Sequence, residues 1–325
     1  MNRRTYLSSI GTACTLGVAG CTGGTGEQEN YPSQDIYVRV GGSEGGGTDA
    51  YARNLGAQQE EILDTTFRYE PGFAEFIIPL TEAYNEDNDG HLFLAANLPA
   101  AEIAYLVHEP EWDIRDFVPI CSVGITPLVL FVDSRLEVSD LDDLFDRYRD
   151  GELSGVGVQS SQPEMMAHIM RNDDDWDWQW NELILYGGAS PTIQAIAQGE
   201  VPVGFTADGA GAAIIEDEAT NVEPLVVMSS DGSDLIDAPT TVDEGYPELD
   251  YVGEQTRAQF FPPETPTEIR DTMADSFRQA IESDEVQQWS EESGYPVEYI
   301  TPEETEETMA EFLDTAPDLI DFDQI

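Results

Sequence analysis

The sequence predicts an α/β fold of two lobes, with doubly wound parallel sheets and a ligand cleft between the lobes. Segments with the pattern of strands and segments with the pattern of helices alternate along most of the chain. The alternation restarts near Val138, and 325 residues are enough for two domains. Repeated β-α units of this kind indicate a mostly parallel sheet with helices on both faces.

The first set of elements lies before residue 133. Apolar runs between glycine-rich or polar turns predict strands at 35–40, 66–69 and 91–96 and a helix at about 48–63. The long apolar run 117–132 predicts two buried strands, because Gly124 and Pro127 interrupt it.

The second set follows and leads into terminal helices. It comprises predicted helices at 138–149, 163–170 and 191–198 and predicted strands at 155–158, 183–186 and 201–205. In a further helix predicted at 267–281, apolar residues recur every four positions, so one face must pack on the rest of the fold. We therefore assign residues 35–126 and 253–325 to lobe 1 and residues 127–252 to lobe 2.

Residues 1–20 have the pattern of a twin-arginine lipoprotein signal. Arg3 and Arg4 precede a short apolar stretch, and small residues come directly before Cys21. A first helix is the alternative, but the apolar stretch is too short to span a bilayer permanently. We expect Cys21 to carry a lipid, residues 21–34 to form a tether, and the protein to lie at the extracellular face of the membrane.

The charge of the chain is strongly acidic. It has 66 Asp plus Glu against 13 basic residues, all of them arginine. Loss of Arg3 and Arg4 with the signal leaves 11 arginines against 66 acids, a net charge of −55. At about 1 M salt the Debye length falls to roughly 3 Å, so such a surface suits concentrated salt and resembles proteins of halophilic archaea. We expect no nucleic-acid partner, because the sequence contains no basic patch.

Cys121 is the one cysteine that would remain unmodified in the mature chain, inside an apolar run. A single thiol cannot form an internal disulfide, and no nearby residue offers the histidine or positive charge that a catalytic cysteine needs. We expect a buried, structural Cys121.

Three strand-to-helix junctions, at 45–49, 159–163 and 187–191, share one design. Each has small residues followed by a helix start, with Pro163 and Pro191 at the favoured first position. Unpaired N–H groups and the positive helix end favour an anion such as a carboxylate. The predicted ligand-binding residues are Gly46, Gly47, Thr48, Asp49, Ser160, Ser161, Gly187, Gly188 and Ala189.

Two alternatives to this site remain open. Each junction on its own is compatible with an ordinary tight turn. The carboxylate could instead be held by an arginine through two parallel hydrogen bonds, and Arg39, Arg53 and Arg257 are the candidates.

An exported oxidoreductase is the alternative from another functional class. Gly45-x-Gly47-x-x-Ala50, with Glu70 after the next strand, fits the dinucleotide-binding fingerprint. However, no catalytic set follows: the three histidines, His91, His108 and His168, lack metal-ligand spacing, and no Gly-x-Ser-x-Gly elbow is present. We expect no catalytic residues, no metal and no cofactor.

Several motifs, in order, resemble the substrate-binding proteins of tripartite tricarboxylate transporters, the TctC or Bug family. They are Gly45-Gly46-Gly47-Thr48-Asp49-Ala50-Tyr51-Ala52-Arg53, Asp89-Gly90-His91-Leu92, Asp116-Phe117-Val118-Pro119-Ile120, Tyr186-Gly187-Gly188-Ala189, Gln198-Gly199-Glu200-Val201 and the run 237–246. The similarity covers nearly the whole mature chain.

This resemblance implies a type II periplasmic-binding-protein fold that holds a small di- or tricarboxylate between its lobes and delivers it to membrane permease subunits. It adds Asp208 to the ligand-binding residues. One segment departs from the family pattern, because Phe73 and Glu75 in 72–75 stand where the family has glycines. A receptor for a TRAP-type transporter, whose glycine-rich opening is similar, is the nearer alternative.

Overall fold

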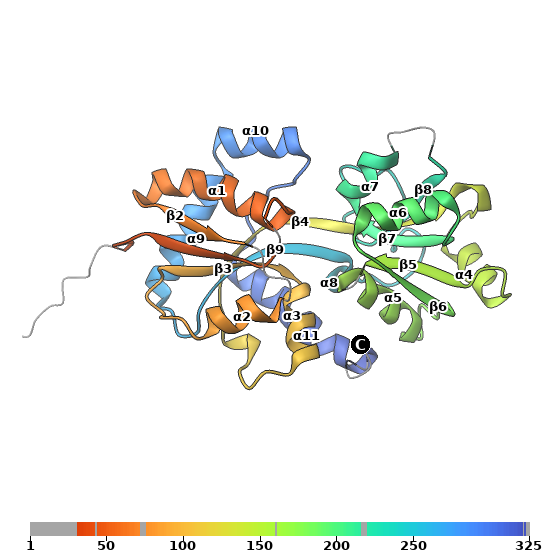
Figure 1. Ribbon diagram of the computed structural model, residues 1–325, viewed down its shortest axis with the longest axis horizontal. Coiled ribbons are helices and arrows are strands. Elements are labelled where there is room, and N and C mark those ends of the chain that lie inside the picture. The colour runs from red at the N-terminus through yellow and green to blue at the C-terminus, as the bar shows by residue number, and fades with distance from the viewer. Residues whose placement is uncertain are drawn as a thin grey trace, which may run out of the picture. The chain divides into compact units, whose positions relative to one another are not determined.

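The computed structural model describes residues 31–42, 44–71, 76–159, 161–215, 220–320 and 322 (Figure 1). The chain divides into residues 1–30 and one compact unit, residues 31–325. The predicted signal, Cys21, residues 21–30 of the tether, Ser160 and the segment 72–75 lie outside the described residues. Within the described ranges, no helix has the length and apolar character needed to cross a membrane.

The first sheet region contains strands β1 (Ile36–Val40), β2 (Phe67–Glu70), β3 (Leu92–Leu98) and β9 (Glu254–Phe261) and the start of β4 (Val118–Asp133). β1 pairs in parallel with β2 and β3, whereas β9 runs antiparallel to β3 and β4. The helices of this part of the chain are α1 (Gly47–Leu63), α2 (Ile77–Tyr84), α3 (Ala100–His108), α9 (Thr267–Ile281) and α10 (Asp284–Ser293).

The second sheet region contains the end of β4 together with β5 (Gly155–Gln159), β6 (Glu182–Tyr186), β7 (Val203–Ala207) and β8 (Val222–Val227). β5 pairs in parallel with β6 and β7, and β4 runs antiparallel to β7 and β8. Its helices are α4 (Leu141–Arg149), α5 (Gln162–Asn172), α6 (Ala189–Gln198), α7 (Asp208–Ile215) and α8 (Asp250–Gly253).

β4 and β9 connect the two sheet regions, as the yellow and light blue strands of Figure 1 show. The prediction of two separate strands in 117–132 is wrong, because β4 is continuous over 16 residues. The pairing of β4 with β9 shifts register between Ser122 and Ile125, which accommodates Gly124. The two connecting strands pair antiparallel, which the alternating sequence pattern did not predict.

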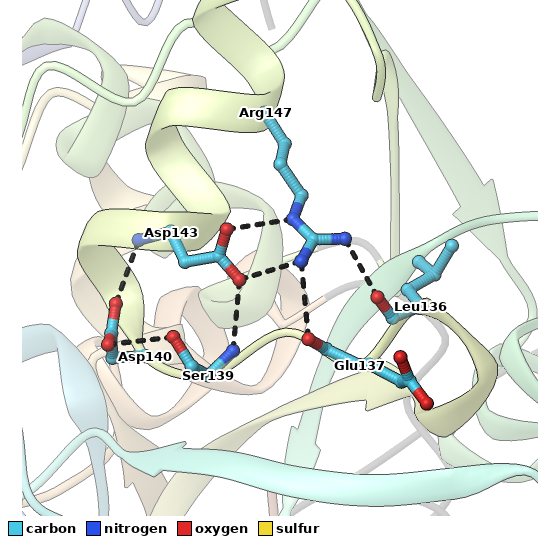
Figure 2. Close-up of polar contacts among 6 residues, drawn as sticks. All are labelled: Leu136, Glu137, Ser139, Asp140, Asp143 and Arg147. Atoms are coloured by element: carbon cyan, nitrogen blue, oxygen red, sulfur yellow. Dashed lines mark hydrogen bonds and ion pairs between the residues drawn. The ribbon is translucent and has the colours of Figure 1, made fainter.

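α4 begins at Leu141 rather than at residue 138, because Asp140 forms its N-cap. Figure 2 shows the Asp140 carboxylate accepting a hydrogen bond from the Asp143 N–H at 2.8 Å. Asp143 in turn accepts hydrogen bonds from Arg147 at 2.9 and 2.8 Å, and Arg147 also donates to the carbonyls of Leu136 and Glu137. The Arg147 hydrogen bonds lower the pKa of Asp143. One arginine therefore fixes both the helix start and the turn before it.

The last helix, α11 (Pro302–Leu319), contributes to the cores of both sheet regions. Met309 and Leu313 belong to a cluster with β3 and α3, whereas Phe312 and Ala316 belong to a cluster built mainly from residues 128–252. A capping box between Thr301 and Glu304 starts this helix.

Two predictions about the core are confirmed. α9 spans 267–281, as its periodicity predicted, and its residues Met273, Phe277 and Ile281 are buried. Cys121 is fully buried with no disulfide, and burial raises the pKa of its thiol well above the ordinary value.

Candidate functional site

The site is built around a cavity of about 490 Å³, here called the Arg257 cavity. Its wall includes Gly47 at the start of α1, Asp208 at the start of α7, Arg257 in β9 and Tyr295 in the loop after α10. Segments that are distant in the sequence therefore meet at one point, next to the strands that connect the two sheet regions.

Arg257 is a buried cation without a carboxylate partner. Its side chain is 6% exposed, and no ion pair to it exists among the residues that the structure describes. The Nη2 atom lies 3.4 Å from Thr126 Oγ1, and the Nε atom has no hydrogen-bond partner. Burial lowers the pKa of the guanidinium, but arginine remains protonated in proteins. A buried charge with free donors is costly unless an anion occupies the cavity that it lines.

The first turn of α1 lies next to this guanidinium. A Cβ atom added at Gly47 would be 3.3 Å from Arg257 Nη2, so the absence of a side chain permits the close approach. The N-cap residue Gly46 provides no side-chain hydrogen bond to the helix. The positive end of α1 and the Arg257 guanidinium therefore favour an anion at the same place.

Thr48 and Asp49 shape this junction from within. Thr48 Oγ1 donates to Asn97 Oδ1 at 2.8 Å. Asp49 is 2% exposed and accepts hydrogen bonds from the Gly45 N–H at 2.9 Å and from Arg53 Nε at 2.8 Å. Neither residue lines the Arg257 cavity. Their side chains instead hold the glycine-rich turn in position.

Asp208 is the contribution of the second sheet region. It is 4% exposed, and its carboxylate accepts hydrogen bonds from the Gly209 N–H at 2.6 Å and from Ser233 Oγ at 2.8 Å. Desolvation raises its pKa, while the bonds from Ser233 and Gly209 and the charge of Arg257 oppose that shift.

A second cavity of about 520 Å³, here called the acidic cavity, shares Asp208, Leu235 and Gly294 with the first. Its inner acid is Glu254, whose Oε1 accepts a hydrogen bond from Ser229 Oγ at 2.5 Å. Desolvation raises the pKa of Glu254 to about 7. Four further acids, all exposed, complete its acidic lining: Asp231, Asp234, Glu291 and Glu298. No group of three or more His, Cys, Asp or Glu in the described ranges is arranged to hold a metal ion.

The other predicted residues lie at the carboxyl ends of β5 and β6. Ser161 forms the N-cap of α5 with a left-handed φ of 78°, and Gly188 forms the N-cap of α6. Because β5, β6 and β7 are parallel, Ser161, Gly188 and Asp208 share one edge of the sheet. Of these, only Asp208 lines either cavity, and Gly187 and Ala189 do not line them either. Their predicted role in ligand binding stays a prediction.

The two rival arginines are already paired with acids. Arg39 bonds to Glu82 and Glu86, and it lies 3.8 Å from Glu70, the predicted ribose acid. Arg53 bonds to Asp49 and stacks over the ring of Tyr69 at 4.9 Å. Of the three candidates, Arg257 alone lines the cavity.

Sequence reasoning missed the loop 229–235 and the segment 290–298, which comprises the end of α10 and the loop after it. Together they form much of the two cavity walls. They carry no motif. Strand β9, which places Arg257, was also missed, although its stretch of Thr, Ala and Phe residues is compatible with a strand.

No family model and no curated protein matches the sequence. Solved structures do match. A TctC solute-binding protein from Polaromonas has a TM-score of 0.76 at 18% identity, covering 89% of this chain and 98% of that one. MatC from Rhodopseudomonas palustris, solved with bound malate, has a TM-score of 0.69 at 19% identity, covering 90% and 100%.

A third structure, an R. palustris protein solved with adipate, has a TM-score of 0.67 at 20% identity, covering 91% of this chain and 99% of that one. The Polaromonas neighbour is a solute-binding protein, and a further match, BugD, with a TM-score of 0.66 at 18% identity, is a periplasmic binding protein. At these identities the similarity establishes the fold: the chain has the two-lobed, mixed α/β fold of periplasmic solute-binding proteins.

Proposed function

We propose that the protein is an extracytoplasmic receptor that binds a small organic acid and delivers it to a membrane transporter of the tripartite tricarboxylate type. The observation that carries this proposal is Arg257, a buried and unpaired cation that lines a cavity beside the N-terminus of α1. A carboxylate would supply the missing partner through two parallel hydrogen bonds. The malate and adipate bound by structural neighbours are acids of this kind.

Ligand capture would use movement of two lobes about the connecting strands. The lobes would comprise residues 35–126 with 253–325 and residues 127–252. Pro127 and Glu254, at these boundaries, pair directly across β4 and β9, so both chain crossings lie side by side. Such adjacent crossings can act as a hinge.

The test is a thermal-shift screen of the purified protein in about 3 M KCl, where its acidic surface is screened. Mono-, di- and tricarboxylates, amino acids, NAD and NADP are compared. Because a ligand that binds only the folded state raises the unfolding temperature, a carboxylate-containing compound should stabilise the protein. Stabilisation by a nucleotide alone would instead support the exported oxidoreductase.

The membrane location and salt adaptation extend this proposal. Cys21 would carry the lipid after removal of residues 1–20, so Cys21→Ser should release the protein from membranes into the medium.

The two folded lobes should lose the circular-dichroism signal of their secondary structure below about 0.1 M salt, because acidic residues then repel one another. An unchanged spectrum there would contradict the salt adaptation.

A further inference from the structure

We infer that the ligand is zwitterionic, with one carboxylate that binds Arg257 and a cationic amine that faces the acidic cavity. This inference rests on the proposed receptor function and specifies its ligand class. It separates the protein from a receptor for di- or tricarboxylates.

The first step concerns the supply of positive charge. Among the described residues that line the two cavities, Arg257 is the only basic one. It is at least nine-tenths buried, and its Nε donor has no partner. One guanidinium matches one carboxylate bidentately, so a second carboxylate on the same ligand would have to find its partners elsewhere.

The second step concerns what the other end of the ligand would meet. The two cavities adjoin at Asp208, Leu235 and Gly294, so a ligand anchored at Arg257 extends toward the acidic cavity. The inner walls there carry the carboxylates of Asp208 and Glu254. Above about pH 7, where Glu254 is ionised, a second carboxylate would be repelled by this wall, whereas an ammonium group, which has three donors and no acceptor, would be attracted.

The general acidity of the chain does not account for these two carboxylates. The four acids at the outside of the acidic cavity are exposed, like the rest of the acidic surface, and salt screens them. Asp208 is 4% exposed, and Glu254 is withdrawn from solvent enough that desolvation raises its pKa. Buried charges of this kind are screened much less.

Both inner carboxylates also retain capacity for a further hydrogen bond. Asp208 receives bonds from Gly209 and Ser233, and Glu254 receives one from Ser229. An ionised carboxylate offers about four acceptor positions, so each has positions left for an amine. Among the described residues, no cluster of three or more His, Cys, Asp or Glu could hold a metal ion, so an organic cation fits this wall better than a metal ion.

The experiment is calorimetry with matched compounds at about pH 8, where Glu254 is ionised, and in about 3 M KCl, which screens the exposed surface. Three series of equal chain lengths are compared: ω-amino acids such as 4-aminobutanoate and 5-aminopentanoate, the dicarboxylates succinate and glutarate, and the monocarboxylates butanoate and pentanoate. The best ω-amino acid should bind at least about tenfold more tightly than the dicarboxylate and the monocarboxylate of the same length.

Variants test whether Asp208 and Glu254 cause the preference for an amine over a second carboxylate. Asp208→Asn and Glu254→Gln should each reduce the ratio of ω-amino acid affinity to dicarboxylate affinity by about tenfold. The matched control is Asp237→Asn, an exposed acid that lines neither cavity, which should leave the ratio unchanged. Two inner variants are used because Asp208 also holds the start of α7, so Glu254→Gln keeps the test valid if Asp208→Asn does not fold.

The outcomes separate this inference from the proposed function. Equal or tighter binding of a dicarboxylate contradicts the inference that the ligand is zwitterionic and leaves the proposed receptor function unaffected. An unchanged ratio in Glu254→Gln also overturns that inference. Absence of binding by every carboxylate, amino acids included, overturns the receptor and the inference together.

Discussion

The junctions at the starts of α1 and α6 have the same kind of sequence and different surroundings. A Cβ atom added at Gly47 would meet Arg257 and Tyr295 at 3.3 and 3.7 Å. One added at Gly187 or Gly188 would have nothing within 4 Å. The first junction therefore lies against a cation and lines a cavity, whereas the second lies open and lines neither cavity.

This difference shows that a glycine-rich turn before a helix is only half of an anion site. An exposed helix terminus stabilises an anion by about 0.3–1 kcal/mol, less than a buried guanidinium can provide through charge-assisted bonds. The junction that also has a cation beside it should dominate affinity.

The largest expected effect is that of Arg257→Gln. It should weaken ligand binding by about 100-fold, because it removes a buried, charge-assisted pair worth about 2–3 kcal/mol. Calorimetry measures the affinity, and Arg53→Gln is the matched control, since Arg53 is paired with Asp49 outside the cavity. Equal losses in the two variants, or retained affinity in Arg257→Gln, would mean that Arg257 does not hold the ligand.

Next in size is the contrast between Gly47→Ala and Gly187→Ala. The first should weaken binding by about tenfold, because the new methyl group crowds Arg257 Nη2. The second should change affinity by less than twofold, which corresponds to a change in binding free energy well under 1 kcal/mol. Gly188 is unsuitable for this test, because its φ of 152° would strain any side-chain-bearing residue. Thermal melts check folding, and a tenfold loss in Gly187→Ala would contradict the comparison.

Asp49→Asn tests the polar contacts that fix the first junction. The variant keeps one acceptor oxygen but loses the charged pair with Arg53, so the free energy of unfolding should fall by about 1 kcal/mol. Urea unfolding in concentrated salt measures this change. The α6 junction offers a matched control in Ser190→Ala, at an exposed position, which should change stability by less than about 0.5 kcal/mol.

A pH dependence of similar size is expected from Glu254. Its pKa in the folded protein is raised to about 7, so the folded state holds a proton that the unfolded chain releases at lower pH. The stability from this group is full below the unfolded pKa and is lost as pH rises through 7. From pH 6 to 8 the unligated protein should lose about 1 kcal/mol. Glu254→Gln should remove most of that slope, and an identical slope in the variant would assign the dependence to another group.

Sequence patterns predicted individual helices and buried residues better than they predicted which strands pair and in which direction. The bounds of α9 and the burial of Cys121 followed from local periodicity and composition. The start of α4 did not follow from the apolar pattern, because the helix begins directly after the residue that caps it, Asp140. The antiparallel course of β4 and β9 depends on contacts between residues more than 120 positions apart, which no local pattern records.

The candidate site was predictable in part for the same reason. Sequence reasoning named Gly47 in the α1 junction, the family resemblance added Asp208, and Arg257 was named as a rival; the structure brings these three residues to one cavity. It could not choose among Arg39, Arg53 and Arg257. That choice depends on which arginine forms no ion pair with an acid, and this is a property of the folded chain alone.

α11 has a consequence for the order in which the protein can fold. Its residues are synthesised after every strand of the sheet, yet they complete the cores of both sheet regions. Domains usually form one after another as a chain emerges from the ribosome. In this chain the cores of both sheet regions stay incomplete, with apolar surface exposed, until α11 has been synthesised.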